Sequence, residues 1–229
     1  MNSQGTTAIL VFANSAKEDL AIKSIPKGEQ LFHHLTRTTL KKAQNTGLPV
    51  FHFSDKDQVG ATFGERFTNA IANVFDKGFS RIITIGNDTP HLKTQHLKHT
   101  AKQLSLGKTV IGPSNDGGFY LLGLQKSNFD VSGFHNLPWQ RFSLYHQISL
   151  WLRKESSELI KLPVLQDLDN EKDLQTILSF SRSLSSILLL LIIRLLRIKR
   201  SLNYTNQNFL CLFPDRFMFN KGSPEVLFV

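Results

Sequence analysis

Two acidic residues that directly follow apolar strands are the first candidates for chemistry in this sequence. Asp88 lies in the turn cluster GNDTP, which follows the β-branched run at 81–85. Asp116 lies in the loop GPSNDGG, which follows a second short strand at 109–111. In open α/β sheets, ligands bind at the carboxyl ends of the strands. We therefore predict a site for a divalent metal and a phosphate, built from carboxylates at two strand ends.

Asp167 and Asp169 form a second acidic pair. Side chains two residues apart on an extended segment point to the same side, so one of the pair could complete a metal site with Asp88. The alternative for Asp169 is that it only caps the helix predicted over 170–180. The alternative for Asp88 is a turn aspartate that bonds its own backbone before Pro90.

The loop that contains Asp116 is too rich in glycine and polar residues to serve only as a connector. Gly117 and Gly118 would let backbone N–H groups approach phosphate oxygens. Asp116 would then hold an acceptor or a ribose, and Ser114 and Thr89 are further hydroxyl candidates. The alternative is a tight hairpin turn before the next apolar strand.

The composition indicates one α/β domain with enough chain to bury a sizeable core. The chain has 229 residues, of which 41% are hydrophobic and 20% charged. Its net charge is +9, and the segment from Ser179 onward holds seven Lys and Arg against two Asp and Glu. The body is thus only mildly basic and has no basic-aromatic stripe, so nucleic acid is not expected as a partner.

The single cysteine and the N-terminal residues bear on the cellular compartment in which the protein is expected. Cys211 excludes a disulfide or a cysteine metal cluster within a monomer. The stretch MNSQGTTAILVFANS lacks the charged start and long apolar core of a signal peptide. We therefore expect a cytoplasmic protein.

Short apolar strands alternate with amphipathic helices along the first half of the chain. Strands are expected at 7–13, 48–53, 81–85, 109–111 and 119–124, and helices at 28–45, at 60–76 and around 97–104. The polar loop at 14–19 lacks the glycine spacing of dinucleotide or P-loop motifs. The order predicts a single-domain, three-layer α/β/α fold with a mostly parallel central sheet.

The pattern loosens after residue 124. We expect a loop or lid at 126–138, an amphipathic helix with Phe142 on its inner face at 141–154, and a strand at 159–165. These elements complete a domain over 1–178, followed by a basic and apolar C-terminal helix and tail over 179–229.

The run ILLLLIIRLLRI at 187–198 belongs to this tail. A membrane span needs ~20 mostly apolar residues, and Arg194 and Arg197 interrupt the run. Together with Arg200 they fall on one helix face, which predicts an amphipathic helix that packs on the body or forms a homo-oligomer contact. Contact of 187–200 with a membrane surface is the less favoured interpretation.

Five sequence blocks, taken in order, resemble a known family. They are GERF at 64–67, GNDTPHL at 86–92, GPSNDGGFYLLGL at 112–124, LPW at 137–139, and the segment from DLD to DL at 167–174. The resemblance is to the DUF2064 family of bacterial glycosyltransferase-like proteins, and it covers roughly residues 5–178. It implies the GT-A, or nucleotide-diphospho-sugar transferase, fold. Its superfamily includes the phospholactate and molybdenum-cofactor guanylyltransferases, so the resemblance leaves the reaction open.

Further site residues are implied by the resemblance. Many members carry Lys-Thr-Arg-Leu after the first strand, and the nearest counterpart is the segment KSIP at 23–26, so the lysine matches and the arginine does not. Lys23 and Arg66 would contact phosphates, although Arg66 could equally be a solvated helix residue. Trp139 would form part of an acceptor wall, whereas a lone tryptophan is more often a packing residue.

These observations leave three functions open. The first is a metal-dependent glycosyltransferase that acts on a nucleotide-sugar and an unknown acceptor. The second is a guanylyltransferase-like nucleotidyltransferase that releases pyrophosphate, and the third is a non-catalytic nucleotide-binding protein. In the first two, Mg²⁺ or Mn²⁺ held by Asp88 with Asp167 or Asp169 would neutralise a diphosphate. We expect Asp88 and Asp116 to be the catalytic residues.

Overall fold

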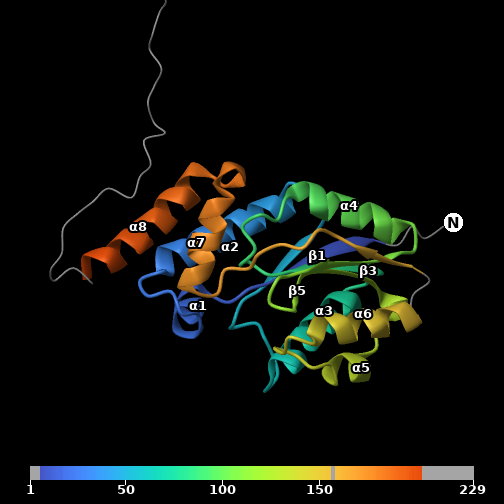
Figure 1. Ribbon diagram of the computed structural model, residues 1–229. Coiled ribbons are helices and arrows are strands. Elements are labelled where there is room, and N and C mark those ends of the chain that lie inside the picture. Colours follow the sequence, from blue (N-terminus) through green and yellow to red (C-terminus); the bar gives the residue numbers. More distant parts are fainter. Residues whose placement is uncertain (1–5, 156–157, 203–229) are drawn as a thin grey trace, which may run out of the picture.

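A six-stranded sheet forms the centre of the computed structural model, which describes residues 6–155 and 158–202 (Figure 1). The strand order is β2-β1-β3-β5-β4-β6. The strands are β1 (Thr7–Phe12), β2 (Val50–Phe53), β3 (Arg81–Ile85), β4 (Thr109–Pro113), β5 (Phe119–Gln125) and β6 (Leu159–Lys161). Every neighbouring pair is parallel except the two that β5 makes with β3 and β4. The predicted mostly parallel sheet is confirmed.

Helices cover both faces of this sheet (Figure 1). One face carries α3 (Phe63–Asp76), α5 (Val131–His135) and α6 (Leu144–Glu155), and the other carries α2 (Glu29–Gln44) and α4 (Thr94–Ser105). Successive strand side chains point to opposite faces, so Leu10 and Ile82 pack toward α3 while Ile9 and Ile83 pack toward α2 and α4. This arrangement confirms the three-layer α/β/α architecture.

The C-terminal helices pack beside α2 at one end of the molecule. They are α7 (Glu171–Ser179) and α8 (Ser186–Leu202), with a short 3₁₀ turn, η2 (Ser181–Ser183), between them. Phe32 of α2, Leu174 of α7 and Ile192 of α8 share a third apolar cluster, to which α1 (Ala16–Ile22) also contributes. The C-terminal helical extension is thus confirmed, whereas a domain boundary at residue 178 and self-association of the tail remain predictions.

Among the described residues, no helix is long and apolar enough to cross a membrane. Residues 203–229, which include Cys211, lie outside the described part of the chain.

Three local predictions need correction. Asn170, not Asp169, caps α7, because its side chain accepts hydrogen bonds from the backbone N–H groups of Lys172 and Asp173. Phe142 precedes α6 instead of lying on its inner face, and it is 80% exposed. The predicted loop at 126–138 contains α5 and the 3₁₀ turn η1 (Lys126–Asn128).

Candidate functional site

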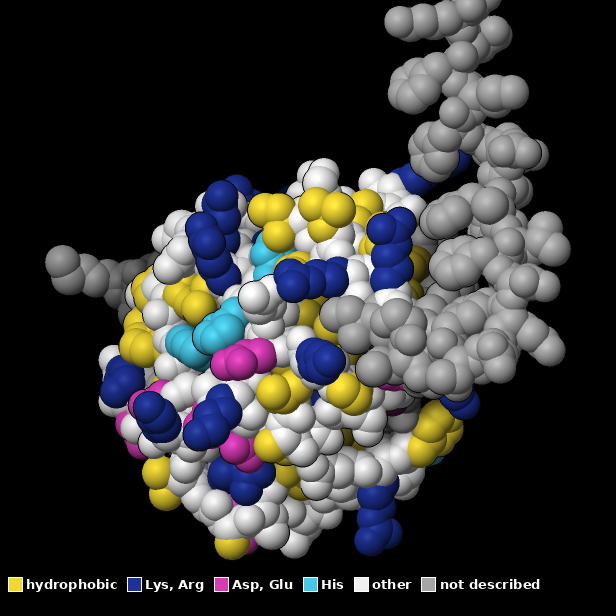
Figure 2. Space-filling view, turned by 90° about the vertical axis from the view of Figure 1, so that its left-hand side faces the viewer, with side chains coloured by type: hydrophobic (Ala, Val, Ile, Leu, Met, Phe, Trp, Pro, Cys, Tyr) yellow, Lys and Arg dark blue, Asp and Glu magenta, His cyan; other side chains and the backbone are white. Residues whose placement is uncertain are grey.

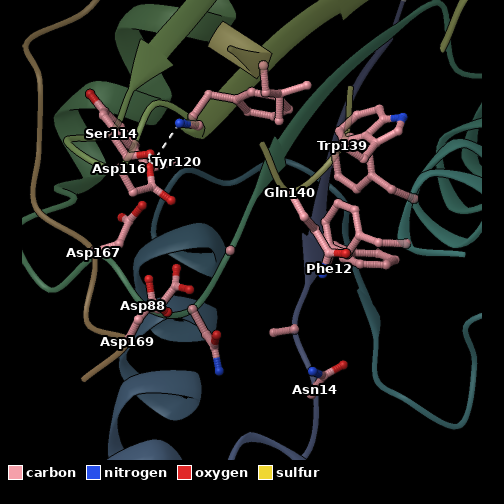
Figure 3. A pocket seen from close by; sticks show the side chains of 18 of the residues that line it. Phe12, Asn14, Asp88, Ser114, Asp116, Tyr120, Trp139, Gln140, Asp167 and Asp169 are labelled. Atoms are coloured by element: carbon pink, nitrogen blue, oxygen red, sulfur yellow. Dashed lines mark hydrogen bonds between the residues drawn. The ribbon is translucent and has the colours of Figure 1, made fainter. Parts of the chain in front are cut away.

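A cavity of about 450 Å³ opens at the carboxyl ends of β1, β3 and β4 (Figure 3). Its volume lies within the usual range of small-molecule sites, roughly 300–1,000 Å³. Its walls come from five segments, at 12–23, 58–67, 84–88, 114–120 and 139–144, together with Asp167 and Asp169. These segments meet because parallel strands place their carboxyl ends at one edge of the sheet.

One side of the cavity is acidic, and we call it the acidic half. It consists of Lys23 and five aspartates: Asp19, Asp88, Asp116, Asp167 and Asp169. Figure 3 shows the last four aspartates on one side of the cavity, contributed by three separate loops. The sheet edge thus gathers carboxylates that are far apart in sequence, and it provides a single lysine among them.

Lys23 is the central cation of the acidic half. Its Nζ lies 2.7 Å from Oδ2 of Asp88 and 2.9 Å from Oδ1 of Asp169, and it donates to the Leu168 carbonyl at 3.1 Å. Its side chain is only 11% exposed. Burial alone would lower the pKa of Lys23, but the two adjacent carboxylates outweigh burial and raise it. Lys23 is therefore a fixed positive charge held by three oxygens.

The pKa values of Asp167 and Asp169 are both raised above the usual aspartate value. Burial raises the pKa of Asp167 well above its usual value, and the nearby Asp88 carboxylate raises it further, against the lowering effect of a hydrogen bond from Thr89. Burial also raises the pKa of Asp169, although Lys23 opposes this shift. A further cation at this position would favour ionisation of both groups.

The β4–β5 loop presents Asp116 to the cavity. Oδ1 of Asp116 accepts hydrogen bonds from the Ser114 hydroxyl and from the Gly118 N–H, which lies 2.9 Å away. Gly117 has a φ of +87°, and a Cβ there would collide with the backbone carbonyl of Phe142. The alternative of a tight turn is therefore confirmed, and this turn places the Asp116 carboxylate at the cavity.

Asp19 is an acidic cavity residue to which the sequence reasoning gave no role. It lies on α1, is 3% exposed, and accepts a hydrogen bond from Nδ2 of Asn87 at 2.9 Å. Burial raises its pKa, and the hydrogen bond from Asn87 opposes this. The available signal was its place in the polar segment after the first strand, which is also a strand end.

The opposite side of the cavity is aromatic, and we call it the aromatic half. It is lined by Phe12, Phe63, Phe67, Phe119 and Trp139. The Trp139 ring centroid lies 5.6 Å from that of Phe63 and 5.2 Å from that of Phe67. The Trp139 Nε1–H donates to the Phe134 carbonyl at 2.7 Å, which fixes the orientation of the indole. Trp139 is therefore both a packing residue and a cavity wall, as Figure 3 shows.

Two features of the backbone allow the indole to reach this position. Gly64 lies in the first turn of α3, and a Cβ on it would collide with Cδ1 of Trp139. Gln140, which follows Trp139 and also lines the cavity, has a φ of 58°. A non-glycine residue in this left-handed region is strained, and such strain clusters at functional sites. The glycine of the GERF block thus makes room for the tryptophan of the LPW block.

The predicted site residues divide into those that line the cavity and those that support it. The lining residues are Lys23, Arg66, Asp88, Ser114, Asp116, Gly118, Trp139, Asp167 and Asp169. The supporting residues are Thr89, whose hydroxyl donates to Asp167, and Gly117, whose carbonyl accepts from the Tyr145 N–H. The contributions of Asp19 and of the phenylalanines were missed. The phenylalanines gave no signal, because single aromatic residues in a sequence are typical of a hydrophobic core.

The acidic half matches the donor chemistry of a hard divalent cation. Carboxylate and carbonyl oxygens are what Mg²⁺ and Mn²⁺ prefer. The Lys23 ammonium already acts as a stand-in cation between Asp88 and Asp169. In the described part of the chain, no three acidic, histidine or cysteine side chains yet surround one point as a metal set. Lys23 Nζ occupies the position between one oxygen of Asp88 and one oxygen of Asp169.

Comparisons with known proteins agree with this fold. Residues 30–141 match the model of a family described as "Uncharacterized protein conserved in bacteria (DUF2064)". The resemblance stated from the sequence blocks is thereby confirmed over these residues. No curated protein matches the chain in sequence.

Comparison with solved structures gives matches at low sequence identity. A presumed nucleotide-diphospho-sugar transferase from Desulfovibrio desulfuricans G20 is 22% identical, with a TM-score of 0.63 over 86% of this chain and 96% of that one. A Mycobacterium tuberculosis H37Rv protein in complex with manganese is 13% identical, with a TM-score of 0.48 over 76% of this chain and 98% of that one. The first likeness supports the predicted nucleotide-diphospho-sugar transferase fold.

Proposed function

We propose that the protein is a metal-dependent transferase that uses a nucleotide-activated donor and moves a glycosyl group from a nucleotide-sugar to an acceptor. This proposal rests on one observation. The cavity at the carboxyl ends of the strands has an acidic half and an aromatic half. An acidic half suits a diphosphate with its cation, and an aromatic half suits flat or apolar ligand groups.

The residues of the acidic half receive the diphosphate in this proposal. Asp88 and Asp169 would hold Mg²⁺ or Mn²⁺ with help from Asp167, once Lys23 withdraws from between them. The cation supplies the positive charge that stabilises a departing nucleoside diphosphate. Lys23 and Arg66 carry the positive charges among the predicted site residues, and both line the cavity. They would contact the phosphate oxygens.

Asp116 is placed for the acceptor. The hydrogen bonds within its loop end on Oδ1, and we propose that Oδ2 accepts a hydrogen bond from the acceptor hydroxyl or from a ribose. Removal of a proton from an attacking hydroxyl by a positioned carboxylate is general base catalysis. Trp139 and its phenylalanine neighbours would form the wall against which the acceptor lies.

Product identity tests the reaction class. The protein is incubated with Mn²⁺, a panel of nucleotide-sugars and a panel of hydroxyl acceptors, and separately with nucleoside triphosphates and sugar phosphates. Release of a nucleoside diphosphate from a nucleotide-sugar supports glycosyl transfer. Release of pyrophosphate from a triphosphate would assign nucleotidyl transfer instead. If nucleotides bind but neither product forms across the panel, the protein would be a nucleotide-binding protein without catalytic activity.

Asp88→Ala tests the site itself. We expect this variant to lose Mn²⁺-dependent nucleotide binding in calorimetry while it keeps its fold, because the Asp88 backbone carbonyl still accepts from the Leu168 N–H. Asp76→Ala is the matched control, since Asp76 is an exposed aspartate at the end of α3. Unchanged metal-dependent binding in Asp88→Ala would reject the assignment of Asp88 as a ligand.

A further inference from the structure

The outer face of α8 combines exposed apolar side chains with positive charge. Ile187 is 60% exposed and Leu190 is 67% exposed. Arg194 and Arg197 are exposed farther along the helix. These four positions follow helical spacing and form one stripe. The opposite face is used for packing, because Leu188 and Ile192 are buried against α2 and α7. The exposed stripe is thus not needed to hold α8 on the body.

The surroundings of this stripe are also apolar and basic. Phe180, at the end of α7, is 61% exposed, and Arg182 is exposed two residues later. The sequence contains no Asp or Glu between Asp173 and Asp215. Figure 2 faces the end of the molecule at which α8 lies in Figure 1, and near its top hydrophobic side chains lie among those of Lys and Arg.

The neighbouring helix extends the positive charge. Arg37 and Lys41 are exposed on α2, the helix against which α8 packs. The acidic residue of α2 is Glu29, which lies in its first turn. The helix that contacts α8 therefore adds two exposed cations to those of α8 itself.

We propose that this surface, formed by α8, Phe180 and the adjacent basic side chains, binds the face of an anionic lipid membrane. Interfacial helices place apolar residues at the level of the lipid headgroups while Lys and Arg contact anionic headgroups. Arginine side chains at such a boundary keep their charge in the polar layer while their stems lie along apolar material. The surface attaches the protein to one leaflet, since α8 is too short and too charged to span the bilayer.

Charge decides between a lipid surface and a second copy of this chain. In an isologous dimer with parallel α8 helices, Arg194 and Arg197 would face the same arginines of the partner, and like charges repel. With antiparallel helices they would lie against the partner's apolar Ile187 and Leu190, so neither arrangement supplies an opposite charge. The exposed apolar groups are also few, whereas a stable interface buries about 800 Å² on each partner. An anionic membrane offers the opposite charge and receives Ile187 and Leu190 without a matching protein pocket.

Vesicle flotation with the full chain tests the proposal. We expect binding to phosphatidylcholine vesicles that contain phosphatidylglycerol, little binding to pure phosphatidylcholine, and weakening with salt because exposed charges are screened. Leu190→Glu and Arg194→Glu should each reduce binding at least tenfold, with unchanged circular dichroism. Leu106→Glu is the matched control, because Leu106 is 60% exposed at the C-cap of α4. It should bind as the wild type does.

Three results would overturn the proposal. The first is an absence of wild-type binding to anionic vesicles. The second is binding that Leu190→Glu leaves unchanged, since attachment would then occur elsewhere or by charge alone. The third is a dimer in sedimentation that Leu190→Glu dissociates, because the stripe would then be an interface between copies of the chain.

Discussion

The acidic and aromatic halves of the cavity are built by different physical means. The acidic half consists of charged groups that repel one another and are held in place by Lys23, Thr89 and Asn87. The aromatic half consists of rings that attract one another and pack as core, with Trp139 fixed by one hydrogen bond. A cation bound in the acidic half would favour ionisation of its buried carboxyl groups, whereas the aromatic half is packed without a ligand.

Gly64→Ala should break the aromatic half and give the largest change in stability. The added Cβ would displace Trp139 from its place against α3, and such overpacking costs ~1–3 kcal/mol. The gain in helix propensity offsets about 1 kcal/mol of this cost. We expect a net loss of up to about 2 kcal/mol in urea unfolding, with a changed tryptophan emission.

Asn73→Ala is the matched control for this change, because Asn73 is exposed on the same helix. It should leave the emission unchanged and stabilise α3 slightly. Equal stability of Gly64→Ala and Asn73→Ala would show that the indole is not held at Gly64.

Lys23→Met should increase the difference between the two halves, because it removes the ammonium that lies among the carboxylates of the acidic half. The ammonium and a divalent cation would compete for oxygens of Asp88 and Asp169, and two unit charges ~4 Å apart repel by several kcal/mol near a protein surface. We expect Mn²⁺ affinity without nucleotide to rise about tenfold, a gain of ~1.4 kcal/mol. Electron paramagnetic resonance of free Mn²⁺ measures it.

Lys17→Met provides the control, since Lys17 is exposed on α1. Its Mn²⁺ affinity should equal that of the wild type. If Lys23→Met bound Mn²⁺ no better than Lys17→Met, the oxygens around Lys23 would not be the metal ligands.

Asp19→Asn should give the smallest effect, and one that depends on pH. Burial raises the pKa of Asp19, so the folded state holds its proton to higher pH than the unfolded state does. This contribution to stability is complete below the usual aspartate pKa and is lost as pH rises through the folded pKa. In Asp19→Asn the side chain still accepts the hydrogen bond from Asn87, but it cannot ionise. The variant should therefore be more stable than the wild type by about 1 kcal/mol near pH 7.

Urea unfolding in a chelator at pH 4 and pH 7 measures this effect. Asp19→Asn should gain on the wild type as pH rises. A stability difference that stays constant between the two pH values would contradict a raised pKa at Asp19.

The order of elements was predictable because the apolar periodicity is local. The strand at 81–85 and the helix at 28–45 were expected within a residue or two of β3 and α2. The direction of β5 was left open, because the glycine-rich loop before it was interpreted as a binding loop, with a hairpin turn as the alternative. A parallel crossover needs roughly a dozen residues or more, so the short loop already favoured the antiparallel pairing of β4 with β5. The antiparallel pairing of β5 with β3 appears only when the sheet is assembled.

The sequence by itself determined the α/β/α class and put acidic residues at strand ends, since both follow from residue type and spacing along the chain. Only the tertiary structure decided that Lys23 lies between Asp88 and Asp169, that Asp19 joins them, and that Gly64 admits Trp139. These contacts join segments up to about 150 residues apart in the chain. Distances of that kind are fixed by how the layers pack, which no local pattern encodes.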